Sequence, residues 1–167
     1  MLKNFIYLVT LLFVFTSCKQ NKKETHKTGL ITGNAMVVSA RVEASQIGSA
    51  ILKKGGNVFD AMIATELALA VAYPYAGNLG GGGFMVYRKV NGDLGAIDYR
   101  EKGPLAATKN MYLDEFGNVI PEKSTIGAMA VGVPGTVAGV LAVHEKFGSL
   151  PLKDILEPVI ALAYRGI

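Results

Sequence analysis

The distribution of apolar positions along this chain predicts most of its helices and strands. Ala44, Ile47 and Ile51 are three and four residues apart, the spacing of one helix face, so residues 43–54 are expected to form a helix. A glycine pair at 55–56 follows and ends it, because glycine adopts the left-handed conformation of a helix cap at little cost.

The next segment, residues 58–72, is apolar on nearly every side, which is typical of a central, buried helix. Asn57 can cap its start, and Asp60 lies in its first turn. Tyr73-Pro74 ends it, because the residue before a proline is excluded from the helical region. Upstream, the short apolar run 35–40 predicts a buried strand.

Residues 84–90 and 94–99 are rich in β-forming side chains and flank Asn91-Gly92-Asp93, which predicts a β-hairpin. Residues 102–125 carry turn-forming glycine, asparagine and proline and are expected to be mostly loop.

Two more helices are expected, over residues 136–147 and from Pro151 onward, with Pro158 interrupting or kinking the second. Strand, two helices, hairpin and two helices in this order predict α/β (α+β) layers. About three strands are too few to cover a fully apolar helix, so we expect the chain to be part of a larger fold.

Charge along the chain separates a tail from a neutral body. The 167 residues carry a formal charge of +4, yet residues 29–167 contain 12 basic and 12 acidic side chains. The excess lies in Lys3 and in residues 19–28, where four lysines accompany Glu24. A nucleic-acid-binding protein gathers its cations on the folded part, so we expect no nucleic-acid partner.

The first residues have the features of an export signal. Lys3 precedes an apolar run at 5–15, and the small residues Thr16-Ser17 stand before Cys18. The apolar run is shorter than the roughly 20 residues that span a bilayer. We interpret 1–17 as a lipoprotein signal peptide, Cys18 as the lipidated first residue and 18–34 as a polar linker. A plain signal peptide with an incidental cysteine is the alternative.

The sequence contains few residues that could bind a metal ion or form a disulfide. Cys18 is the single cysteine, and His26 and His144 are the two histidines, so neither an internal disulfide nor a metal-binding histidine pair is expected. We expect no metal and no cofactor. His144, beside Glu145, is interpreted as a solvated helix position.

Two segments could form a binding site. Four consecutive glycines, Gly80–Gly83, lack the features of a phosphate loop but require backbone to approach a ligand or another segment closely. Arg100, at the end of the predicted hairpin, carries a guanidinium suited to gripping a carboxylate. Taken alone, however, an arginine in this setting is more often part of a surface ion pair, here with Asp98 or Glu101. The chain presents no convincing nucleophile.

Four segments together resemble the γ-glutamyltranspeptidases in order and separation. They are Lys53–Ala61 (KKGGNVFDA), Gly80–Phe84 (GGGGF), Asp98–Glu101 (DYRE) and Val131–Gly139 (VGVPGTVAG). Each segment is weak evidence alone, whereas the four in succession are highly specific. The resemblance extends over residues 35–167, which we therefore identify as a partial large-chain domain of this family.

The resemblance implies a four-layer α-β-β-α sandwich of the N-terminal-nucleophile hydrolases, incomplete in this chain. It also implies a self-cleaving precursor whose new N-terminal threonine attacks the γ-glutamyl amide of glutathione and passes the acyl group to water or an amino acid. That threonine is expected beyond this chain, on the small chain, so residues 1–167 contain no catalytic residue and are expected to be inactive alone. Arg100 corresponds to the arginine that grips the α-carboxylate of the glutamyl group.

The expected partners are thus the γ-glutamyl substrate, the rest of the large chain, the small chain and, through the anchor, a bacterial membrane on the periplasmic side or cell surface. Two alternatives remain at this point. An acylase resembling the cephalosporin acylases would hydrolyse a glutaryl side chain, and a truncated gene would leave a non-catalytic lipoprotein remnant.

Lipidation at Cys18 is the most direct prediction from the N-terminal pattern. Mass spectrometry of the mature protein is expected to find an N-terminal peptide that begins at Cys18 and carries acyl chains, two or more of which hold a protein at a membrane. A mature N-terminus elsewhere, with an unmodified Cys18, would contradict this interpretation.

Overall fold

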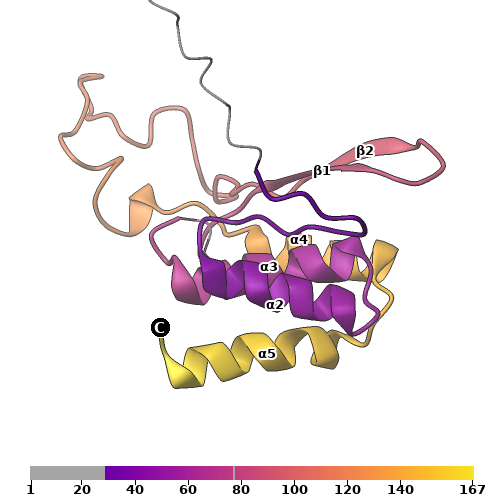
Figure 1. The fold of residues 1–167 in the computed structure, drawn as a ribbon. Coiled ribbons are helices and arrows are strands. Elements are labelled where there is room, and N and C mark those ends of the chain that lie inside the picture. Colours follow the sequence, from indigo (N-terminus) through magenta and orange to yellow (C-terminus); the bar gives the residue numbers. More distant parts are fainter. Residues whose placement is uncertain (1–28, 77) are drawn as a thin grey trace, which may run out of the picture. The chain divides into compact units, whose positions relative to one another are not determined.

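The computed structural model describes residues 29–76 and 78–167 of the chain. The chain divides into two compact units, residues 1–33 and 34–167, and every helix and strand that is described belongs to the second (Figure 1). The predicted signal peptide, Cys18 and His26 lie outside the described residues.

Helices and a hairpin make up the second unit, which confirms the predicted mixture of α and β structure. The described elements are α2 (Val42–Lys53), α3 (Val58–Ala72), β1 (Phe84–Arg88), β2 (Leu94–Asp98), the 3₁₀-helix η1 (Ala128–Ala130), α4 (Thr136–Phe147) and α5 (Leu152–Arg165). The helix boundaries agree with the predicted ones to within one residue.

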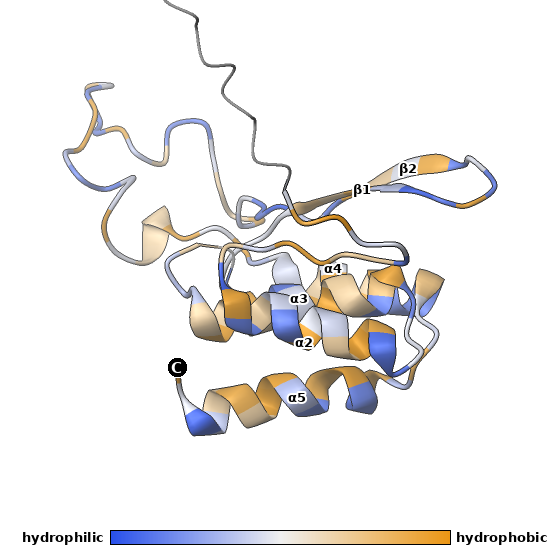
Figure 2. Cartoon of the chain, in the orientation of Figure 1, coloured by the Kyte–Doolittle hydropathy of each residue, from blue (hydrophilic) through white to orange (hydrophobic). Residues whose placement is uncertain are grey.

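Helix α3 is central, as its all-round apolar sequence predicts. It contacts α2, α4 and α5, and more than half of its residues are buried. Figure 2 shows apolar residues in each of the four helices and hydrophilic residues at the hairpin turn. Close packing of α2 on α3 depends on Gly48, where a Cβ would collide with the Thr65 hydroxyl. The core of this unit is therefore built around α3.

The start of α3 is fixed by a capping box that also holds a distant loop. The Asn57 side chain accepts hydrogen bonds from the N–H groups of Phe59 and Asp60, and the Asp60 carboxylate accepts one from the Asn57 N–H at 2.9 Å. The same carboxylate, fully buried, accepts bonds from the hydroxyl and N–H of Ser149. Asp60 therefore joins the start of α3 to the α4–α5 connection.

Three aromatic rings attach the hairpin to the helices. Phe59 stacks on Phe147 with ring centroids 4.4 Å apart, and Tyr87 meets Phe147 edge-on at 4.9 Å. Because these rings come from α3, α4 and β1, the cluster fixes the hairpin relative to the two helices. Aromatic pairs of this kind contribute about 0.5–1.5 kcal/mol beyond the area they bury.

The hairpin itself pairs β1 and β2 antiparallel, with Phe84 opposite Asp98 and Arg88 opposite Leu94. The prediction of a hairpin around Asn91-Gly92 is confirmed, and both strands end earlier than predicted. Met85 is buried toward the helices, whereas its neighbours Phe84 and Val86 are exposed. One face of the ladder therefore lies on the helical core.

Two predictions need correction. Residues 35–40 do not form a strand, because neither of the two described strands pairs with them. Val37 packs its side chain against the helical core, whereas Met36 is 47% and Val38 80% exposed, so only part of the apolar run is buried. Of the two outcomes expected at Pro158, the interruption is wrong, because α5 continues to Arg165. Because proline has no backbone N–H, α5 lacks one hydrogen bond from Pro158 to the preceding turn.

The buried Asp60 carboxylate gives a prediction for stability against pH. Burial alone would raise its pKa, but hydrogen bonds from the Ser149 hydroxyl and the Asn57 and Ser149 N–H groups outweigh burial and hold the pKa below its ordinary value. Its stabilisation is therefore complete above the unfolded-state pKa of about 4 and is lost as the pH falls through the lower folded-state pKa.

Asp60→Asn in the full-length protein is expected to lower the free energy of unfolding by about 2–3 kcal/mol at pH 7, with a smaller difference below about pH 4. Asp154→Asn is the matched control, because its bridge to Lys54 at 3.4 Å is solvent-exposed and contributes about 0–1 kcal/mol. Denaturant unfolding measures both variants. Equal losses, or a loss at Asp60 that is unchanged at pH 3, would contradict this role.

Candidate functional site

Arg100 lies directly after β2, on the exposed side of the hairpin end. Its guanidinium lies 5.6 Å from the centre of the Phe84 ring, and its Nε is 3.7 Å from an oxygen of Glu101. The Asp98 carboxylate accepts a hydrogen bond from the Arg100 backbone N–H at 3.0 Å. The surface ion pair considered from the sequence is thus present with Glu101, in a long and exposed form that contributes little. The Arg100 side chain is 63% exposed, so a ligand can reach it from solvent.

A pocket of about 330 Å³ adjoins Arg100. It is formed by the end of β2, by the segment before α4 and by the first turns of α4; its lining residues are Ile97, Asp98, Tyr99, Arg100, Lys102, Val133, Pro134, Gly135, Ala138, Gly139 and Ala142. Arg100 and Lys102 are the cations among these lining residues. Such a pocket suits a small ligand that carries a carboxylate.

Tyr99, the residue before Arg100, is the anchor of this segment. Side chains alternate across the strand, so Tyr99 points to the helical side while Asp98 and Arg100 point away. Only 7% of Tyr99 is exposed. A Cβ at Gly139 of α4 would collide with its ring, and a Cβ at Gly83 would lie 2.9 Å from it. The ring therefore occupies a slot that exists only because both neighbours are glycine.

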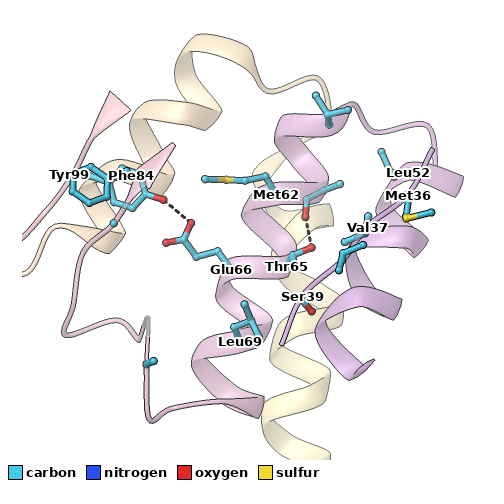
Figure 3. Close-up of a pocket in the computed structure, with 15 residues that line it drawn as sticks. Met36, Val37, Ser39, Leu52, Met62, Thr65, Glu66, Leu69, Phe84 and Tyr99 are labelled. Carbon is cyan, nitrogen blue, oxygen red and sulfur yellow. Dashed lines mark hydrogen bonds between the residues drawn. The ribbon is translucent and has the colours of Figure 1, made fainter. Parts of the chain in front are cut away.

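The far end of the Tyr99 ring reaches α3. Its hydroxyl donates a hydrogen bond of 2.9 Å to the Glu66 carboxylate (Figure 3). Burial raises the pKa of Glu66, and the bond from Tyr99 opposes part of that rise. Burial and the neighbouring Glu66 also raise the pKa of Tyr99, so the phenol keeps its proton and donates.

The glycine run approaches other backbone, which is one of the two possibilities left open by the sequence. A Cβ at Gly82 would lie 2.6 Å from the Tyr99 carbonyl oxygen and 2.8 Å from the Arg100 Cα. The Gly81 carbonyl accepts hydrogen bonds from the N–H groups of Gly135 and Thr136, at 2.8 and 3.1 Å. These contacts join the glycine run, the Arg100 segment and the start of α4 in one packed assembly.

Several functional contacts were not identified from the sequence. Glu66 and Tyr99 were overlooked, although a lone carboxylate in the middle of an apolar helix is a recognisable signal. Thr136 is buried, and its hydroxyl donates to the Asn78 carbonyl at 3.0 Å. His144 is half-buried with its Nε2 2.9 Å from the Leu150 carbonyl, so its interpretation as a solvated position is wrong.

Metal ligation and membrane crossing find no candidates in the described part of the chain. Within residues 29–76 and 78–167, no three or more His, Cys, Asp or Glu side chains are grouped so that they could hold a metal ion. None of the helices described there combines the length and apolar character that crossing a bilayer needs.

Comparison with known proteins agrees with these motifs. The family described as gamma-glutamyltranspeptidase matches residues 44–167. A glutathione hydrolase proenzyme of Pseudomonas sp. (strain A14) is 53% identical over 133 residues, which are 80% of this chain and 23% of the relative. The corresponding proenzyme of Escherichia coli (strain K12) is 49% identical over 131 residues, 78% of this chain and 23% of the relative.

Among solved structures, the Helicobacter pylori gamma-glutamyltranspeptidase superposes with a TM-score of 0.77 at 49% identity, covering 80% of this chain and 38% of that one. A cephalosporin acylase from Bacillus halodurans gives 0.65 at 25% identity, covering 87% of this chain and 28% of that one. This chain thus spans about a quarter of the length of the relatives it matches. From its motifs, its fold and the extent of the family match, the chain belongs to the γ-glutamyltranspeptidase family.

Proposed function

We propose that the protein containing this chain hydrolyses or transfers the γ-glutamyl group of glutathione and related amides, and that Arg100 binds the α-carboxylate of that group. The observation that carries the proposal is the setting of Arg100. It lines a pocket of about 330 Å³ with its side chain exposed, on a backbone held by glycines of two other segments.

The chemistry follows from the residue types. A guanidinium can bind a planar carboxylate through two parallel hydrogen bonds, which fixes both the position and the orientation of the glutamyl group. The hydroxyl of an N-terminal threonine, supplied outside residues 1–167, then attacks the γ-carbonyl while its own α-amine takes the proton. The departing amine is protonated, and water or an amino acid releases the γ-glutamyl group from the threonine. Arg100 contributes binding and orientation rather than bond breaking.

The greater identity to glutathione hydrolases, 53% against 25% for the cephalosporin acylase, supports γ-glutamyl amides over glutaryl amides as substrates. The distinction matters at Arg100, because a glutaryl group also presents a carboxylate to a guanidinium. It lacks the α-amino group, so activity on γ-glutamyl anilide beside glutaryl anilide separates the two. Faster turnover of the glutaryl compound would favour the acylase alternative.

The same proposal assigns a place and an architecture to the whole protein. Residues 35–167 are one part of a four-layer α-β-β-α sandwich, whose other strands and helices come from the remainder of the large chain and from the small chain. Cys18 carries the lipid that anchors the exported enzyme to a bacterial membrane, and 18–34 is the polar linker between anchor and enzyme. The neutral charge of residues 29–167, against the basic tail, supports this division.

Replacement of Arg100 tests the binding role. In the full-length enzyme, Arg100→Ala is expected to lower kcat/KM for a γ-glutamyl anilide by roughly 10²-fold, because a hydrogen bond to a charged group contributes about 1.5–3 kcal/mol and the carboxylate is left unpaired. Arg100→Lys keeps the charge without the planar fork and should recover only part of the loss. Self-cleavage, which needs no glutamyl ligand, should remain.

The control substrate is the same amide without its α-carboxylate, and the control variant is Arg88→Ala, an exposed arginine at the opposite end of the hairpin. The loss at Arg100 should appear only with the carboxylate-bearing substrate, and Arg88→Ala should behave as wild type. Equal losses on both substrates, or no loss, would show that Arg100 does not bind this carboxylate.

A further inference from the structure

Glu66 is the one feature of α3 that helix packing does not explain. Asp60, the other acidic residue of this helix, serves the capping box, whereas Glu66 stands in the middle turn. It lines a pocket of about 560 Å³ whose walls are mostly apolar, with Met62 and Leu69 one turn away on either side (Figure 3). A carboxyl in such surroundings is costly unless it is hydrogen-bonded, and its bond comes from Tyr99.

Backbone pairing flanks Arg100 on both sides. After it, the N–H and carbonyl of Lys102 pair with Val133, at 3.1 and 2.8 Å, whereas before it the hairpin ladder weakens toward its end. β2 ends at Asp98, and beyond it the ladder continues through one bond of 3.0 Å, from the Tyr99 N–H to the Gly83 carbonyl, and one of 3.4 Å in return. The second is at the long limit for a hydrogen bond. On the hairpin side of Arg100, the side chain of Tyr99 adds a further restraint, with its ring in the slot between Gly83 and Gly139 and its hydroxyl on Glu66.

The position of Tyr99 determines the position of Arg100, the next residue in the chain. Its guanidinium makes only a 3.7 Å ion pair with Glu101 and lies over the Phe84 ring, so neither contact fixes it tightly. The location of its Cα, packed against Gly82, determines where the guanidinium can reach. Tyr99 also separates the two cavities, since it lines both the pocket with Glu66 and the pocket with Arg100.

We infer that Glu66 is a positioning residue for substrate binding: its hydrogen bond to the Tyr99 hydroxyl sets the place of Arg100 and thereby the selectivity for an α-carboxylate. This inference rests on the proposed function, because it assigns Glu66 a role in the binding step given to Arg100. Glu66 does not touch the substrate. Glu66 lies on α3 and acts through the Tyr99 ring on Arg100, which contacts the substrate.

Steady-state kinetics of full-length variants test this role with γ-glutamyl anilide and the same amide lacking its α-carboxylate. Glu66→Leu and Tyr99→Phe each break the hydrogen bond and are expected to raise KM for the carboxylate-bearing substrate by about tenfold, with kcat changed much less. Glu66→Gln keeps an acceptor for the phenol and should restore a nearly normal KM. Met62→Leu, which alters the same pocket without touching the bond, is the control and should leave KM unchanged.

A double-mutant cycle separates positioning from general stability. In an Arg100→Ala background, Glu66→Leu should cause no further rise in KM, because the residue it positions is gone. Tyr99→Phe retains the ring in its slot, so it tests the bond even if Glu66→Leu fails to fold. Thermal midpoints of each variant identify losses that come from unfolding.

The outcomes distinguish the two proposals. If Arg100→Ala loses the carboxylate preference while Glu66→Leu and Tyr99→Phe keep it, the positioning role is wrong and the proposed function stands. Additive KM effects in the cycle would overturn the positioning role as well. If Arg100→Ala itself keeps the preference, the proposed function is wrong, and the inference fails with it.

Discussion

The arrangement of this chain depends on the insertion of one tyrosine ring between two glycines. Tyr99 enters the slot bounded by Gly83 and Gly139, and its carbonyl lies so close to Gly135 that any side chain there would collide with it. These contacts join β1, β2 and α4 at one point. The hydroxyl adds α3 through Glu66. Because interiors are close-packed, a side chain at any of these glycines would displace the segment that carries Arg100.

This close packing around Tyr99 explains why glycines occur in two separate segments of the chain. Gly80–Gly83 precedes β1, and Gly135 and Gly139 lie four residues apart at the start of α4, on one face of the helix. The hydrogen bonds from the N–H groups of Gly135 and Thr136 to the Gly81 carbonyl attach these two segments to each other. Arg100 thus stands on a backbone platform made by three segments of the chain. Such a platform suits the role proposed for Arg100, which is to hold a carboxylate in one orientation.

Local features of the sequence were sufficient for the elements but not for the contacts between them. Asn57 and the glycine pair at 55–56 marked the helix boundaries, and Asn91-Gly92 marked the hairpin, because capping and turn chemistry act over a few residues. The hydrogen bonds that Ser149 donates to Asp60 and Tyr99 donates to Glu66 join residues 89 and 33 positions apart, which no local pattern encodes. The strand expected at 35–40 failed for the same reason, since a ladder needs a partner that lies elsewhere. Arg100 was identified because it lies in one of four motifs that together resemble a family. Its neighbouring residues alone would not have identified it.

The central claim is that the platform around Tyr99 presents Arg100 to an α-carboxylate. Competitive inhibition of the full-length enzyme by L-glutamate and by 4-aminobutyrate, which lacks only that carboxylate, tests it most directly. The account predicts that L-glutamate inhibits at a concentration roughly 10²-fold lower than 4-aminobutyrate, and that this ratio approaches one in Arg100→Ala. Equal inhibition by the two compounds in the wild-type enzyme, or a ratio unchanged in Arg100→Ala, would contradict it.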